Sequence, residues 1–114
     1  TDSQAEDELY EFLIDTRKHM MEIRSELNPN DFKPLPETLN AWTDPAVSHE
    51  EGARMAMETG SLYGCTKKVK EQVAELKELG VCHLLCQTGF GAMDMQQNIS
   101  SMRRFGEEVI PSFS

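Results

Sequence analysis

The stretch that decides the fold is Gly80-Val81-Cys82-His83-Leu84-Leu85-Cys86-Gln87, which lies between a helix-forming run and a glycine-containing loop. Apart from His83, its central residues are apolar at odd and even positions alike. A strand that is buried on both faces, as in a parallel sheet, has this pattern. Residues 81–86 are therefore predicted to form a short buried strand.

The segments around this strand complete an alternating order. Residues 62–64 are a short apolar stretch that ends in a glycine, and they predict an earlier strand. Residues 67–79 have the apolar spacing of a helix, with Thr66 as its expected cap and a buried apolar stripe. A last helix is expected over residues 94–109. Two parallel strands joined by a helix need other segments to cover their edges and faces.

The first half of the chain predicts two helices and a connecting strap. Residues 3–27 have apolar side chains at spacings of three and four, which is typical of one long helix. Four of the five prolines fall in residues 28–47, and the apolar residues between them predict a strap that packs on the protein. Ser48 and Glu51 have the spacing of a capping box, so a helix that ends at Gly60 is expected.

Length and charge restrict the function. The chain has 114 residues, 20 of them acidic and 11 basic, with a net charge of −9. That length fits one domain and is too short for a complete β/α barrel of about 250 residues. The acid excess argues against nucleic acid and against anionic lipid as partners. No apolar run approaches the roughly 20 residues of a membrane helix.

The three cysteines predict neither a disulfide framework nor a metal centre. Their odd number favours a reducing, cytoplasmic compartment. Cys65, Cys82, His83 and Cys86 are zinc-ligand types, but a strand over 81–86 would place His83 on the face opposite the two cysteines. The same alternation separates a cysteine nucleophile from a histidine base. We therefore assign no metal site and no catalytic residue.

The loop after the second predicted strand is the candidate binding site. It reads Gln87-Thr88-Gly89-Phe90-Gly91 and leads into a helix, which is where α/β enzymes bind ligands. Its glycines permit close approach of the backbone, and the Gln87 amide both donates and accepts hydrogen bonds. Tyr63 holds the corresponding position after the first strand. An ordinary connecting loop can have the same composition, so both interpretations stay open. The candidate cofactor-binding or substrate-facing residues are Tyr63, Gln87, Thr88, Gly89, Phe90 and Gly91.

Four stretches follow one another in a recognisable order. They are residues 62–73, residues 79–87, the pair Phe90-Gly91, and residues 102–111, which end in Phe105-Gly106-Glu107-Glu108-Val109-Ile110-Pro111. This ordered set covers about half of the chain and resembles the C-terminal end of luciferase-like flavin-dependent monooxygenases, the bacterial luciferase superfamily. Two departures are Cys82, where the family often has Asp, and Ala92-Met93 in place of Gly-Leu.

The resemblance implies an α/β fold, namely a C-terminal fragment of a TIM (β/α)8 barrel, mostly helical with about two short parallel strands. Residues 1–61 would be a long helix, a Pro-rich strap and a capped helix that precede the last barrel strands. Residues 62–114 would be the β-α-β-α end of the barrel, with residues 87–91 at its mouth near flavin or substrate.

The resemblance also implies an oxidoreductase that uses reduced FMN and O2, with FMN supplied by a separate flavin reductase. The strongest flavin-phosphate contacts of the family come from earlier strands and loops. We therefore do not expect this fragment to bind FMN or to turn over alone, and its expected partner is the remainder of the barrel or another copy of itself. The alternative is a non-catalytic helical interaction module, or a truncated paralogue, that self-associates.

Overall fold

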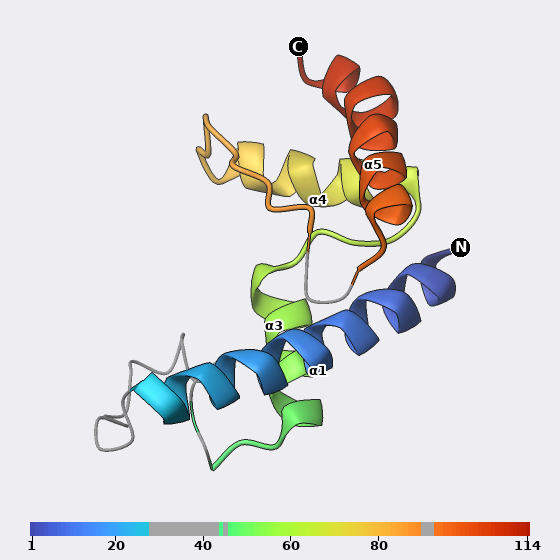
Figure 1. Ribbon diagram of the computed structural model, residues 1–114. Helices are drawn as coiled ribbons and strands as arrows, with labels where there is room; N and C mark the ends of the chain where they lie inside the picture. The colour runs from blue at the N-terminus through green and yellow to red at the C-terminus, as the bar shows by residue number, and fades with distance from the viewer. Residues whose placement is uncertain (28–43, 45, 90–92) are drawn as a thin grey trace.

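A computed structural model describes residues 1–27, 44, 46–89 and 93–114 (Figure 1). Most of the strap predicted over 28–47 lies outside these residues. The elements in chain order are the helices α1 (Asp2–Leu27), α3 (His49–Gly60), α4 (Thr66–Glu78) and α5 (Met95–Arg104), followed by the π-helical turn η2 (Phe105–Val109) and the 3-10 turn η3 (Ile110–Ser112).

Helices α1 and α3 pack against each other and form one half of the molecule. Leu13 of α1 is fully buried, and Leu9 lies one turn before it on the same face. They meet small or flexible side chains of α3, which let the two backbones approach closely. The buried core of this half consists of Leu9, Leu13, Ala53, Ala56 and Met57.

Arg17 continues the buried face of α1, and it joins α1 to the segment before α3. Its side chain is only 1% exposed. The guanidinium donates to the carbonyls of Asp44 at 2.7 Å and Val47 at 2.8 Å, and it lies 2.9 Å from Nδ1 of His49. Burial lowers the pKa of Arg17, against the opposing effect of Asp44 and Glu50. Fixed acceptors of this kind are what make a buried guanidinium tolerable.

The Ser48 side-chain cap of the predicted capping box before α3 is confirmed. Ser48 has an extended backbone, and its hydroxyl accepts from the amide of Glu51 at 3.1 Å. The helix then ends at Gly60, as expected.

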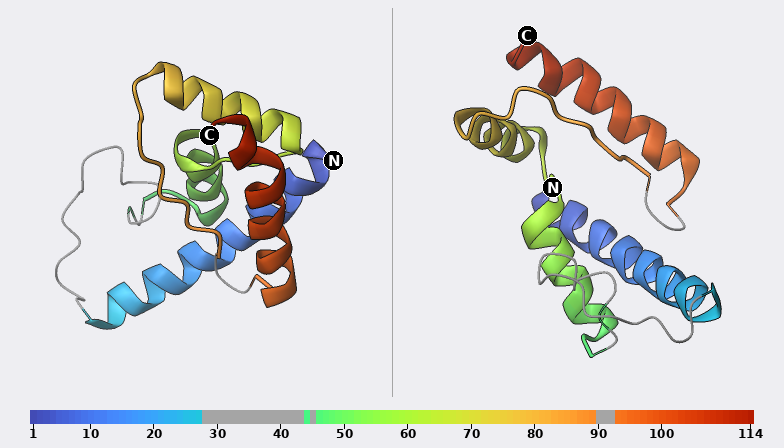
Figure 2. Two further views of the ribbon diagram at one scale, coloured as in Figure 1. Left: turned by 90° about the horizontal axis from the view of Figure 1, so that it is seen from above. Right: turned by 90° about the vertical axis from the view of Figure 1, so that its left-hand side faces the viewer.

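Helices α4 and α5 and the turns η2 and η3 form the other half (Figure 1 and the right-hand view of Figure 2). This half has little core. Neither α4 nor α5 has a fully buried residue, and Val109 of η2 is the one buried apolar side chain here among the described residues. The radius of gyration, 15.6 Å, exceeds the roughly 13 Å of a compact domain of similar size.

The prediction of a barrel fragment with two short parallel strands is wrong. The described part of the chain contains no strand, and it is a small helical assembly. Residues 62–64 form the connection between α3 and α4. Residues 81–89 run without regular structure along α4 and the C-terminal helix, and no backbone ladder forms on them. A strand exists only where a second backbone supplies hydrogen bonds, and no other described segment lies in that position.

Helix ends were predicted better than helix burial. Gly80 has φ +90°, the left-handed conformation expected after the last turn of α4. Cys65 rather than Thr66 holds the cap position of α4, and Thr66 is its first helical residue. The apolar stripe of α4 is only half-buried, and Leu79 is 81% exposed. A helix stripe becomes core only when a neighbouring element covers it.

No helix of the described residues has both the length and the hydrophobicity needed to cross a membrane. The longest, α1, has 26 residues and carries charged side chains along its whole length.

We predict that Leu13→Ala lowers the free energy of unfolding by about 2–5 kcal/mol, because it leaves a cavity at the centre of the α1–α3 contact. Leu27→Ala is the matched control at a 75% exposed position of the same helix and should change it by less than about 0.5 kcal/mol. Urea unfolding followed by circular dichroism measures both. Equal losses in the two variants would show that the core lies elsewhere.

We predict that Arg17→Met lowers the free energy of unfolding by about 1–3 kcal/mol, because the carbonyls of Asp44 and Val47 lose their buried donor. Arg54→Met is the control. Arg54 is exposed, with its guanidinium 5.1 Å from the Tyr10 ring, and its loss should cost about 0.5–1 kcal/mol. A neutral result for Arg17→Met would mean that packing alone holds α1 on α3.

Candidate functional site

The predicted site residues fall into two separate places. Gln87 is exposed, Thr88 and Gly89 are half-buried, and the Gln87 amide donates to the Gly89 carbonyl at 3.4 Å. Gly89 lies against Asn98 of α5, since a Cβ on Gly89 would sit 2.9 Å from Nδ2 of Asn98. Phe90 and Gly91 lie outside the described residues. Gly89 thus lies against the first turn of α5.

Tyr63 belongs to different surroundings. Its ring packs against the α1–α3 core, and Nζ of Lys68 lies 4.2 Å from the ring centroid. Its amide donates to Oε1 of Gln72 at 3.2 Å. None of these contacts involves residues 87–89. Tyr63 therefore contacts both the α1–α3 core and α4, and the structure does not bring it together with residues 87–89.

Two apolar hollows lie beside the extended segment 81–86. The larger, about 540 Å³, is lined by α4 residues and by Val81, Cys82 and Leu84. The smaller, about 230 Å³, lies between Leu84, Cys86 and the C-terminal turns. Val73, Leu84 and Phe113 line both. These hollows show where the segment fails to pack tightly on the helices, and neither is lined by residues 87–89, the described part of the predicted ligand loop.

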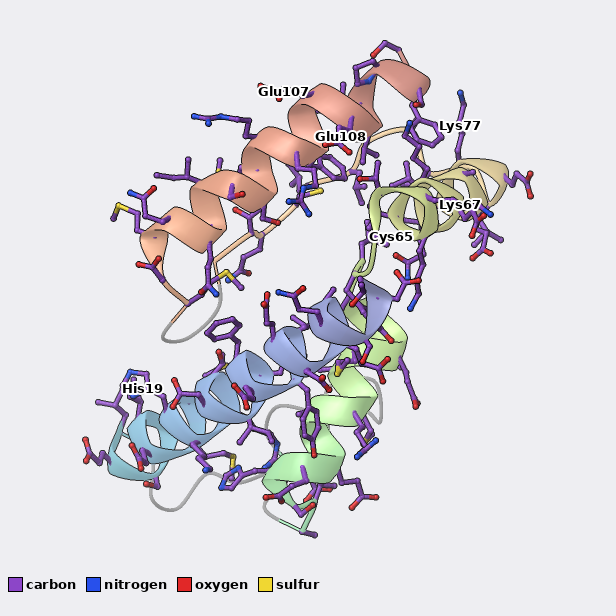
Figure 3. All side chains as sticks on the ribbon, turned by 90° about the vertical axis from the view of Figure 1, so that its right-hand side faces the viewer. His19, Cys65, Lys67, Lys77, Glu107 and Glu108 are labelled. Carbon is purple, nitrogen blue, oxygen red and sulfur yellow. The ribbon has the colours of Figure 1, made fainter. Side chains whose placement is uncertain are left out.

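The best-organised polar site is the first turn of α4, which the sequence analysis did not identify (Figure 3). Two carboxylates come to it from opposite ends of the chain. Oδ1 of Asp2 accepts from the Cys65 amide at 2.6 Å, and the Thr66 hydroxyl donates to Oε2 of Glu108 at 2.5 Å. A helix N-terminus is partly positive, so it stabilises both anions. This site joins α1 and η2 to the start of α4.

Gly64 makes the Asp2 contact possible. Its φ is +126°, which strongly favours glycine, and a Cβ there would lie 2.8 Å from Oδ1 of Asp2. The Cys65 amide, then the Cys65 thiol and Lys68, hold the pKa of Asp2 below its usual range. The sequence offers only a weak signal for this contact, because Asp2 and Cys65 are 63 positions apart. Asp2 otherwise has the ordinary role of an acidic residue in the first turn of α1.

Cys65 is half-buried, Cys82 and Cys86 are exposed, and all three are free thiols. Within the described ranges, no three His, Cys, Asp or Glu side chains lie close enough together to hold a metal ion. The polar cluster at α4 connects parts of the chain, since one oxygen of each carboxylate already accepts a hydrogen bond from the start of α4.

The described residues do not build a flavin site by themselves. An FMN site needs walls for a large ring and donors for a phosphate. The 87–89 loop supplies one exposed amide and packs its glycine on Asn98, and both hollows lie elsewhere. We therefore derive no chemical step through a flavin.

Comparison of the chain with protein-family models, with curated proteins and with solved structures finds no match.

We predict that the Asp2 carboxylate stabilises the fold in a pH-dependent way. Because folding lowers the pKa of Asp2 below its ordinary value, the contribution of the carboxylate is fully present above about pH 5 and is lost as the pH falls through the lowered pKa. Wild type should therefore unfold at higher urea than Asp2→Asn at pH 7, and the difference should shrink below pH 4.

Asp2→Ala serves as the control, because it also removes the acceptor for the Cys65 amide. Its unfolding midpoint should lie below that of Asp2→Asn at every pH. Identical pH profiles for wild type and Asp2→Asn would contradict a role for the charge.

Proposed function

We propose that this chain is part of a luciferase-like flavin-dependent monooxygenase, an oxidoreductase that uses reduced FMN and O2. The observation that carries the proposal is the ordered set of stretches at 62–73, 79–87, 90–91 and 102–111. Separate loops or helices of unrelated proteins share single stretches of this kind. A whole series in one order and at one spacing is much more specific.

Two features of the described residues support this proposal. The helix expected in the first motif is present, since α4 follows the Gly64 turn and is closed by Gly80. The segment 81–86, in addition, has the composition of an internal strand but lies exposed, with Leu85 98% accessible. Apolar residues in that state are typical of a segment whose packing partner is missing.

In this proposal the chain contributes residues to the enzyme without forming a complete site. Gln87, Thr88 and Gly89 remain the candidates for contact with flavin or substrate, together with Phe90 and Gly91, and Tyr63 remains a candidate by its position in the first motif. The flavin would supply the redox chemistry when bound. The partners of the chain are then the rest of the enzyme and a flavin reductase, and its compartment is the cytoplasm.

The test begins with the length of the reading frame and the intact mass of the source protein. We expect the reading frame to encode more than 114 residues and the intact mass to exceed 12.9 kDa. FMN should bind the longer protein in a fluorescence titration, whereas the 114-residue chain alone should give no quenching. Gln87→Ala in the longer protein should weaken reduced-flavin binding or raise KM by about tenfold, the loss of one good hydrogen bond. Lys67→Ala is the control, because the Lys67 side chain is 87% exposed on α4.

Failure of the longer protein to bind FMN would overturn the flavin part of the proposal. A reading frame that encodes only these 114 residues would overturn the assignment of the chain as part of an enzyme. It would leave the second candidate, a non-catalytic helical interaction module that self-associates. The exposed apolar residues Met20, Ile23 and Leu27 on the last turns of α1 favour that candidate.

A further inference from the structure

The α1–α3 contact includes a direct hydrogen bond between a guanidinium and an imidazole. Arg17 of α1 is 1% exposed, and its Nη1 lies 2.9 Å from Nδ1 of His49, the first residue of α3. A guanidinium only donates hydrogen bonds and does not lose its charge in proteins, so Nδ1 of His49 is the acceptor. The geometry therefore requires a neutral His49 ring whose proton is on Nε2.

A second proton on the His49 ring has no place in this contact. It would turn the Nδ1 acceptor into a donor, and it would set an imidazolium against a buried cation. The position adds to this effect, because the partly positive N-terminus of a helix disfavours a cation in its first turn. His49 is only half-buried, so its charged ring can turn out to water, whereas the buried Arg17 stays in place.

The described carboxylates around this pair act in the opposite direction. Glu50 and Glu51 lie in the same first turn of α3, and Asp44 lies in the segment before that helix. Asp44 and Glu50 favour the charged form of Arg17, and they attract a proton on His49 in the same way. These carboxylates reduce the repulsion between the two cations, but they do not restore the acceptor that the guanidinium loses.

We propose that His49 is a pH-sensitive latch of the α1–α3 contact: its neutral ring holds the start of α3 on Arg17, and its protonation releases that hold. The carbonyls of Asp44 and Val47 also accept from Arg17 and do not titrate, so release loosens the start of α3 and leaves α1 attached to the preceding segment. The latch belongs to the α1–α3 half and does not depend on flavin chemistry.

The unfolded and folded states set the sign of the pH effect. In the unfolded chain, a histidine takes up its proton between about pH 8 and pH 5. In the folded chain, the same proton on His49 costs the contact with Arg17. The unfolded state thus binds more protons in this range, and the free energy of unfolding falls as the pH falls.

His49→Asn separates the acceptor from the titration. Oδ1 of asparagine is bonded to Cγ, as Nδ1 of histidine is, so the variant keeps an acceptor for Arg17 and cannot take up a proton. Urea unfolding followed by circular dichroism compares the two proteins at pH 8 and pH 5.5. Relative to His49→Asn, the unfolding equilibrium constant of wild type should rise about five- to tenfold between these two values.

His19→Asn is the matched control, because His19 is an exposed histidine on α1 (Figure 3). Its unfolding constant should follow that of wild type at both pH values. A ratio of wild type to His49→Asn that stays constant between the two pH values would overturn the latch. An equal change in the ratio of wild type to His19→Asn would overturn it as well, because any histidine would then have the same effect.

Magnetic resonance of the imidazole nitrogens tests the latch without unfolding the protein. At pH 8, the long-range 1H–15N spectrum of wild type should show His49 with its proton on Nε2 and none on Nδ1. The His49 signals are identified by their absence from the spectrum of His49→Asn. A proton on Nδ1 of His49 in the folded protein at this pH would contradict the hydrogen bond from Arg17 on which the latch depends.

Discussion

The backbone of residues 81–88 imposes the constraint on which the interpretation of this protein depends. Residues 81–87 are exposed, so water can satisfy their N–H and C=O groups. A second strand would satisfy the same groups and would also remove apolar side chains from water. The described residues do not provide that strand. As a result the segment lies loosely along α4 and the C-terminal turns, and apolar hollows remain beside it. Both functional interpretations, part of an enzyme and self-associating module, are ways to meet this constraint.

The other half of the molecule shows what a completed contact looks like. Helices α1 and α3 bury Leu9 and Leu13 against side chains of α3. The Arg17 guanidinium extends this contact by donating to the carbonyls of Asp44 and Val47. The two halves are joined at the start of α4, where Asp2 accepts from the Cys65 amide and Glu108 accepts from the Thr66 hydroxyl. The molecule thus combines one half with its own core and one half whose apolar faces are only partly covered.

The helices were predictable because their signals are local. Spacing located α1, the Ser48 capping box located α3, and Gly80 ended α4. The predicted strands failed because strand formation needs a partner that lies elsewhere in the chain or outside it. Of the candidate site, only the residues that are neighbours in sequence, Gln87 to Gly89, came out together. Tyr63 packs instead against the α1–α3 core, and Phe90 and Gly91 lie outside the described residues.

The amino-acid sequence by itself determined the ends of α1, α3 and α4 to within about one residue, and it determined the apolar, uncharged character of residues 79–93. These properties depend on propensities and caps within a few residues. The tertiary structure alone decided that Arg17 is buried, that Asp2 reaches Cys65, and that residues 81–86 lie unpaired. Each of these outcomes depends on which distant segment comes near, and local spacing has no information about that.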